Sequence, residues 1–112
     1  MPQVSTKVAT IAASASLSDA INTGGGLPVA IQMPAAWTSA ALTFQGSMDG
    51  STYQSIYCSD GTEYSIVAAV ATNVAGFDSS IFVGFNYIKI RSGTAGSPVT
   101  QGAERGLIIA FL

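Results

Sequence analysis

A chain of 112 residues with four basic and six acidic side chains, no histidine and a formal net charge of -2 has little means of binding a polyanion. Nucleic-acid binding needs clustered cations, and Lys7, Lys89, Arg91 and Arg105 form no cluster. The lone Cys58 excludes an intrachain disulfide, and the absence of histidine removes the usual partners of a zinc-bound thiolate.

The sparse charge is the most informative property of the composition. Charged residues make up 9% of the chain, against about 25% in an average soluble domain. The mean hydropathy is +0.44, yet the longest apolar stretches, residues 66–71 and 107–112, have about a third of the length that spans a bilayer. Residues 1–7 lack the basic start and apolar core of a secretory signal. We therefore expect no membrane segment, no export and a surface partly buried against other subunits.

Apolar residues recur along the chain with a period of two, and turn residues interrupt them at short intervals, which is typical of an all-β protein. In chain order, the predicted strands are residues 8–13, 19–22, 27–33, 41–47, 52–57, 62–69, 87–91 and 106–112. Residues 34–38 and 93–102 are predicted loops, and residues 70–77 fit either a strand or a short helical turn. The sequence thus predicts one all-β domain over residues 1–112, a jelly-roll-like antiparallel β-sandwich of about eight strands.

Two Asp-Gly turns organise the middle of the chain. Asp49-Gly50 joins two predicted strands into a hairpin, and Asp60-Gly61 begins the next reversal. We expect both aspartates to accept backbone N–H bonds within their turns. In residues 87–91 the aliphatic side chains are expected to point inward and the cations outward. The nearly continuous apolar run at residues 106–112 predicts a strand that is buried on both faces.

The sequence contains no recognisable catalytic, cofactor or metal motif. Without histidine there is no Ser-His-Asp or Cys-His relay. Residues 24–26 lack the Gly-Lys-Ser/Thr ending of a phosphate loop, and no spaced run of Asp and Asn predicts a calcium loop. We predict that the protein is not an enzyme and binds no cofactor and no metal. The sequence does not exclude a glycosidase site built from two of four carboxylates, although nothing favours such a site. These four are Asp19, Glu63, Asp78 and Glu104.

The aromatic residues and the apolar C-terminus supply the candidate contact residues. Trp37, beside a Pro-Ala-Ala loop, fits a plug at the end of the sandwich better than a ligand platform. Strand tyrosines usually pack against neighbouring strands with the hydroxyl at the rim, and they can also stack on a sugar. The candidates for contact with a partner or a glycan are Trp37, Tyr53, Tyr57, Phe111 and Leu112.

Three segments, residues 8–12, 27–47 and 87–94, resemble small virion proteins of tailed bacteriophages, of the capsid decoration or cement type. The resemblance extends over nearly the whole chain and rests on the amino-acid sequence of these segments. Residues 47–53 and 87–90 also resemble discoidin-like and galactose-binding-like sandwiches, in which the Ser-x-Asp-Gly turn is mainly a hairpin feature.

The resemblance implies a structural virion protein on the capsid exterior, assembled in the host cytoplasm. Its expected partners are the major capsid protein or another virion protein at capsomer junctions, and further copies of itself in a trimer or a dimer. Neither nucleic acid nor a membrane is an expected partner. The alternatives are a carbohydrate-binding module that binds host glycans, or a head-fibre or tail adaptor component involved in host attachment.

Overall fold

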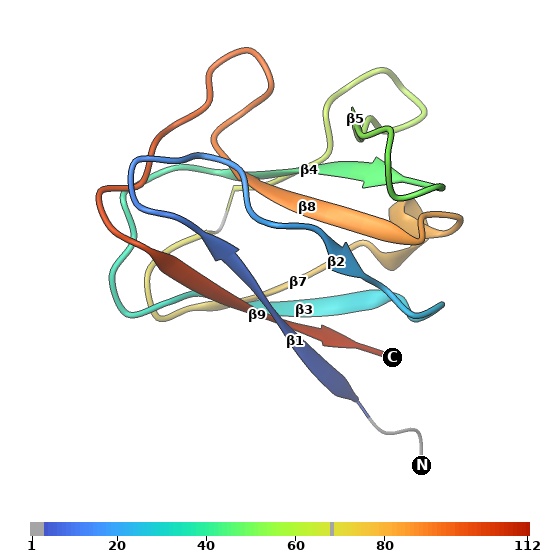
Figure 1. The fold of residues 1–112 in the computed structure, drawn as a ribbon, viewed down its shortest axis with the longest axis horizontal. Coiled ribbons are helices and arrows are strands. Elements are labelled where there is room, and N and C mark those ends of the chain that lie inside the picture. Colours follow the sequence, from blue (N-terminus) through green and yellow to red (C-terminus); the bar gives the residue numbers. More distant parts are fainter. Residues whose placement is uncertain (1–3, 68) are drawn as a thin grey trace.

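The computed structural model describes residues 4–67 and 69–112, which form two stacked antiparallel sheets (Figure 1). The described residues form nine strands and one short 3-10 turn, η1. The elements are β1 (Ser5–Ile11), β2 (Ile21–Asn22), β3 (Pro28–Gln32), β4 (Leu42–Ser47), β5 (Gln54–Ser55), β6 (Ser65–Ile66), β7 (Val74–Gly76), η1 (Ser79–Phe82), β8 (Tyr87–Ser92) and β9 (Arg105–Phe111).

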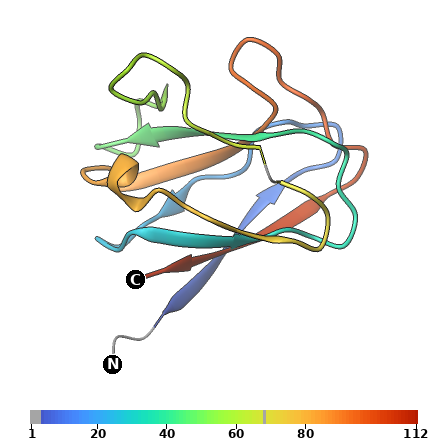
Figure 2. The same cartoon turned by 180° about the vertical axis from the view of Figure 1, so that it is seen from behind.

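The order of the strands is that of a jelly roll. One sheet has the order β1-β9-β3-β7 and the other has the order β2-β8-β4-β5, with β6 also paired to β4. The chain crosses between the two layers after most strands, and the view from behind in Figure 2 shows the same two layers. The predicted antiparallel, jelly-roll-like sandwich is therefore confirmed. β5 and β6 lie within two of the eight predicted strands, and the ninth strand is β7, in the segment 70–77 for which a strand or a short helical turn was predicted.

The core lies between the two sheets and is filled by alternate residues of each strand. Phe44 of β4 is fully buried at the centre of an aromatic group with Tyr64, Phe77 and Phe82. The ring centroids of Phe44 and Phe82 lie 5.3 Å apart at an interplanar angle of 85°. Edge-to-face pairs of this kind contribute about 0.5–1.5 kcal/mol beyond the burial of their area. Tyr64 contributes its ring to this group, and its hydroxyl accepts the backbone N–H of Asp78.

The prediction that the last strand is buried on both faces is wrong. In β9, Leu107 and Ile109 are fully buried, whereas Ile108 between them is 37% exposed and Gly106 is also exposed. β9 lies between β1 and β3, which satisfies its backbone, but only one face of that sheet is covered. Residue hydrophobicity alone cannot distinguish a central strand with one open face from a strand covered on both sides.

The predicted boundaries of several strands are also corrected. The first strand spans Ser5–Ile11, not residues 8–13, because Ala15 bonds back to the carbonyl of Ala12 and Ser14 takes a φ of 64°. β5 and β6 keep only two residues each, since both pair with different parts of β4. Part of the predicted strand 62–69 lies outside the described residues at position 68. The open segment 70–77 contains strand β7.

The hairpin-like loop after β8 generates a stability prediction. Gly93 has a φ of +89°, and a Cβ there would lie 2.6 Å from the carbonyl oxygen of Ser97. Gly61 has a φ of +91°, and a Cβ there would meet no atom within 4 Å. Both alanine substitutions carry the cost of a left-handed backbone, about 1–2 kcal/mol. Gly93→Ala adds a backbone clash of about 1–3 kcal/mol. Denaturant unfolding should show the larger loss for Gly93→Ala, and equal losses would contradict the packing of this loop.

Candidate docking surface

Within the described strands β1, β9, β3 and β7, the outer face of the sheet carries no charged side chain. Alternate residues of these strands point away from the core, and their pairing places them side by side in rows. The row across the middle is Val8, Ile108, Gln32 and Val74. The whole set, which we call the uncharged face, is Thr6, Val8, Thr10, Ala30, Gln32, Val74, Gly76, Gly106, Ile108 and Ala110.

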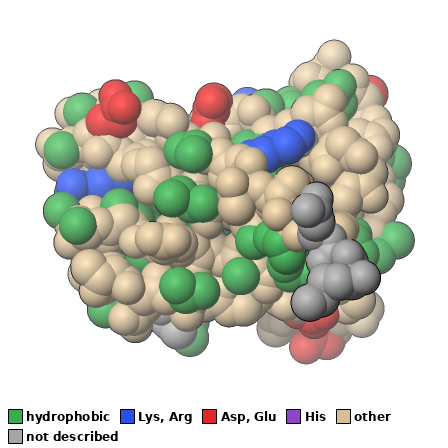
Figure 3. Space-filling model, turned by 90° about the horizontal axis from the view of Figure 1, so that it is seen from below, with side chains coloured by type: hydrophobic (Ala, Val, Ile, Leu, Met, Phe, Trp, Pro, Cys, Tyr) green, Lys and Arg blue, Asp and Glu red, His purple; other side chains and the backbone are tan. Residues whose placement is uncertain are grey.

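The uncharged face exposes three branched apolar side chains. Val74 is 67% exposed, Val8 is 55% exposed and Ile108 is 37% exposed. In Figure 3, which views the molecule from this side, hydrophobic and uncharged side chains fill the middle of the face, and the charged side chains in view lie around it. Depletion of charged residues is typical of the core of a protein–protein interface. This face is therefore the candidate docking surface.

The outer face of the second sheet is chemically different. Lys89 and Arg91 of β8 point to this side, as predicted from the sequence, and lie opposite Gln45 and Thr43 of β4. The ammonium group of Lys89 lies 4.3 Å from the ring centroid of Tyr53, in a cation–π contact. The outer face of the second sheet thus carries cations from β8, whereas the described strands of the uncharged face contribute none to it.

Arg91 is 7% exposed, a degree of burial that the alternation of its strand does not predict. Its guanidinium group donates to the hydroxyls of Thr43 and Ser55 and to the carboxylate of Glu63, at an N–O distance of 3.4 Å. The same carboxylate accepts the backbone N–H of Ala95. The ion pair therefore ties the loops before β6 and after β8 to the sheet. Removal of one partner would leave a buried charge uncompensated.

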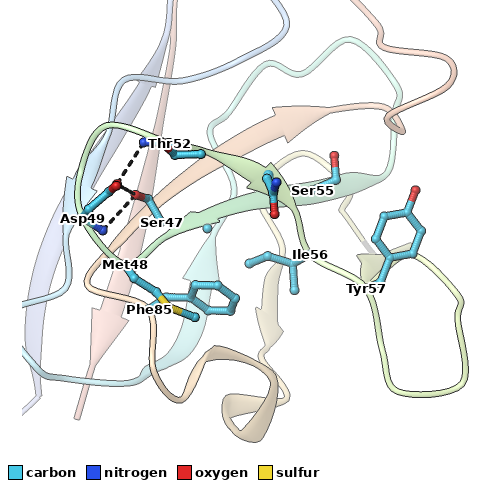
Figure 4. Close-up of a pocket in the computed structure, with 10 residues that line it drawn as sticks. Ser47, Met48, Asp49, Thr52, Ser55, Ile56, Tyr57 and Phe85 are labelled. Carbon is cyan, nitrogen blue, oxygen red and sulfur yellow. Dashed lines mark hydrogen bonds between the residues drawn. The ribbon is translucent and has the colours of Figure 1, made fainter.

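An open cavity of about 320 Å³ lies at the edge of this sheet beside β5. Its apolar lining includes Ile56, Phe85 and Met48, and its rim includes Tyr57, which is 55% exposed. In the view of Figure 4, Ile56 stands between Phe85 and Tyr57. Phe85 packs so closely on Gly46 that a Cβ at that position would lie 2.5 Å from the ring. The cavity combines an apolar floor with a polar rim, which suits a small neutral ligand.

The turn at one end of this cavity is held by Asp49. Its carboxylate accepts the backbone N–H groups of Ser51 and Thr52 and the hydroxyl of Ser47, as the dashed lines in Figure 4 show in part. Asp60 in the second Asp-Gly turn likewise accepts the backbone N–H of Thr62. The prediction that both aspartates cap backbone groups is confirmed. Both carboxylates are therefore used as hydrogen-bond acceptors within their own turns.

The five predicted contact residues do not form one site. Phe111 is 2% exposed and points into the core, so its prediction as a contact residue is wrong. Its position in the alternation of β9 places it with Leu107 and Ile109, inside the sandwich. Leu112, in contrast, is 57% exposed at the C-terminal end of the same sheet, where its backbone pairs with Leu27.

Trp37 lies in the loop between β3 and β4, at an end of the sandwich. Its ring packs partly against the core, and its indole N–H donates to the carbonyl of Ala40 at 3.1 Å. This geometry agrees with the predicted plug. Tyr53 and Tyr57 flank β5, far from Trp37 in the fold, with Tyr53 half-buried under Lys89. Of the five candidates, Tyr57 and Leu112 offer exposed side chains, and neither belongs to the uncharged face.

The sequence identifies Val8 and Thr10 only as strand residues and does not reveal the uncharged face. The available signal is the absence of charge at every second position of the first and last strands. That signal defines a surface only when the pairing of β1 with β9 is known.

Residues 4–67 and 69–112 contain no group of three or more Cys, Asp or Glu side chains placed to hold a metal ion. No helix in this described part is long and apolar enough to cross a membrane.

Comparison with known proteins gives little guidance. No protein-family model and no curated protein matches the chain. Among solved structures, the chain is similar to the crystal structure of the Yersinia pseudotuberculosis-derived mitogen (YPM), with 14% sequence identity and a TM-score of 0.43. The alignment covers 99% of this chain and 86% of that chain. Similarity at this level carries no information about function.

The Asp49 turn predicts a pH dependence of stability. Backbone N–H bonds from Thr52 and Ser51, and the hydroxyl of Ser47, lower the pKa of Asp49 to about 2 from the ordinary value of 3.8. Because the folded-state pKa is the lower one, the stabilisation is present above about pH 4 and is lost as the pH falls toward about 2. The difference in unfolding free energy between wild type and Asp49→Asn should shrink over that window in urea titrations. A difference that stays constant down to about pH 2 would contradict this assignment.

Proposed function

We propose that this chain is a structural virion protein that decorates or cements the assembled head of a tailed bacteriophage. The observation that carries the proposal is the uncharged face of the four-stranded sheet, with Val8, Val74 and Ile108 exposed on it. The resemblance of the sequence to small virion proteins suggests the partner, which is the major capsid protein or another head protein. The uncharged face is the surface that contacts this partner.

An uncharged face suits repeated docking on a lattice. Burial of unpaired ions would cost several kcal/mol each, and this face has none to bury. Alanine, glycine and threonine lose little side-chain entropy when they become ordered. The extended backbone also presents a flat surface that a partner can approach closely.

The size of the face sets the strength expected of one contact. Four strands spaced about 4.8 Å apart, with about five residues rising 3.4 Å each, cover roughly 300–350 Å². A standard stable interface buries about 800 Å² per partner. A single copy is therefore expected to bind weakly through this face alone, and occupancy depends on many sites filled together or on additional contacts.

A protein of this kind stabilises the capsid by mass action. A ligand that binds only the assembled lattice stabilises it by RT ln(1 + [L]/Kd) per site, about 2.7 kcal/mol at a hundredfold excess over Kd. With the uncharged face against the head, the opposite sheet, with Lys89 and Tyr57, faces the solvent. In this orientation the side of the sandwich that carries Lys89 forms part of the outer surface of the virion.

A charge placed on the uncharged face tests the proposal. Val74→Glu introduces an unpaired carboxylate at a residue that is 67% exposed on this face. Val83→Glu is a matched control, because Val83 is 66% exposed but lies between η1 and β8, off the face. Co-sedimentation with purified heads should weaken at least tenfold for Val74→Glu, which corresponds to about 1.4 kcal/mol, and should be unchanged for Val83→Glu.

The same pair of variants can be used in thermal melting of heads. Heads with the wild type or with Val83→Glu should melt at a higher temperature than bare heads, and Val74→Glu should give little increase. Unchanged melting and no co-sedimentation of the wild type would refute the cement function. Equal effects of the two substitutions would refute the assignment of the docking surface.

A second candidate function is glycan binding, as a carbohydrate-binding module or as a head-fibre or tail adaptor in host attachment. The observation that favours it is the exposed ring of Tyr57 beside the open cavity of about 320 Å³. Thr52, Gln54 and Ser55 add polar groups to the same cavity. An aromatic ring with nearby hydroxyl and amide groups matches the mixed apolar and polar surface of a sugar.

Two substitutions of one residue test the glycan function. On a glycan array, Tyr57→Ala should lose at least tenfold in affinity for any retained glycan, because stacking is lost. Tyr57→Phe keeps the ring and should retain most of the binding. If the wild type retains no glycan, or if Tyr57→Ala binds as well as the wild type, this cavity is not a sugar site.

A further inference from the structure

Strand β1 forms a long, open edge of the four-stranded sheet. It occupies one end of the order β1-β9-β3-β7 and spans seven residues, whereas β7 at the other end spans three. Figure 1 shows the N-terminal half of β1 extending away from the rest of the sandwich. An exposed edge strand offers backbone N–H and C=O groups to another strand.

The hydrogen bonds of Thr10 show which backbone groups face this edge. The N–H of Thr10 donates to the Asp19 carboxylate at 2.9 Å, and its carbonyl accepts the Asp19 N–H at 3.2 Å. Both groups therefore point away from β9. In an antiparallel pair the direction alternates, so the backbone groups of Val8 and Thr6 point to the same side. No hydrogen bond joins them to another part of the described residues. Asp19 closes the edge at Thr10 and leaves it open toward the N-terminus.

The only charge of β1 is directed elsewhere. The Lys7 ammonium group donates to the carbonyl of Asn22, and it lies 6.0 Å from the ring centroid of Phe111. A lysine commonly protects an edge strand from pairing by projecting its charge there. In this chain the lysine is bonded within its own molecule, on the inner side of the sheet. Val8 and Val4 are exposed beside the open edge, at 55% and 54%.

We propose that two copies of this chain form a dimer by pairing β1 with β1 in antiparallel fashion, about a two-fold axis at Thr6. The strand is self-complementary, because an antiparallel partner needs the same alternation of outward N–H and C=O groups that β1 itself provides. The pairing belongs to the chain in solution and does not rest on the capsid function proposed above.

The register follows from Asp19 and Lys7. With the axis at Thr6, Val8 lies opposite Val4 of the second copy, and their two exposed apolar side chains meet. Lys7 then lies opposite Ser5 of the second copy, so that no like charges face each other. An axis at Val8 would place Thr10 opposite Thr6 of the second copy, where the Asp19 side chain already occupies the edge.

The dimer would join two four-stranded sheets into one and place their uncharged faces side by side. The combined face would reach roughly 600–700 Å², approaching the area of one side of a standard interface. Two linked docking surfaces also bind a lattice more tightly than either alone. Pairing would cover the open edges, which otherwise favour uncontrolled aggregation.

A disulfide across the axis tests the register. In a Cys58→Ser background, which removes the free thiol of the native chain, Thr6→Cys places two thiols opposite each other. Directly opposite residues have Cα atoms about 4.5–5.5 Å apart, within the range for a disulfide. Mild oxidation should convert most of Thr6→Cys into a covalent dimer. Thr10→Cys, on the same strand but beyond the open edge, should stay monomeric. Circular dichroism checks that both variants keep the β-fold.

Sedimentation velocity of the wild-type chain, without capsids, supplies the second measurement. The proposal expects a reversible species of twice the 11.4 kDa mass as concentration rises. A monomer at every concentration would overturn the proposal. A wild-type dimer combined with no Thr6→Cys cross-link, or with equal cross-linking of Thr10→Cys, would overturn the β1 pairing. Because these readouts need no capsid, their failure is distinguishable from a failure of the Val74→Glu experiment.

Discussion

The alternation of side chains along each strand is the constraint on which this structure depends. Four side chains of β1 and β9 are fully buried in the core, namely Ala9, Ile11, Leu107 and Ile109. Their neighbours in sequence must therefore point to the other side of the sheet. The outer face is therefore determined as strictly as the inner one. In β1 and β9 these outward-pointing residues are uncharged. The face that they share therefore has no charged group whose hydration would oppose burial against a partner.

The two outer faces differ because the few charges are unevenly distributed. The larger sheet carries Lys89 and Arg91, and Arg91 is held under two loops by Glu63, Thr43 and Ser55. The described strands of the smaller sheet carry no charge on their outer face. A sandwich with one charged and one uncharged side can orient itself on a surface, with the uncharged side toward its partner. This asymmetry links the sparse composition of the chain to its proposed structural function.

The sequence predicted the β-sandwich and its jelly-roll character, because period-two alternation and Asp-Gly turns are local signals. Leu42 and Phe44 lie on one face of their strand, as that alternation predicts. The sequence did not predict that Phe111 and Arg91 are buried. Phe111 stands at the end of an apolar run, where it was expected to be available, and it is buried. Arg91 was expected on the solvent side and is covered by the loops before β6 and after β8. The burial of Phe111 follows from its alternation with Leu107 and Ile109, which the continuous apolar run at residues 106–112 conceals. The burial of Arg91 depends on loops that are distant in sequence, which a local pattern does not contain.

The proposed function requires that the uncharged face of the four-stranded sheet contact the capsid. Electron microscopy of the particle that contains this chain can show this contact, since it reveals where the protein lies and which side faces the shell. We expect density on the head, with the side of β1, β9, β3 and β7 against the shell. Density on the tail, or a copy on the head with the Lys89 and Arg91 side against the shell, would contradict it.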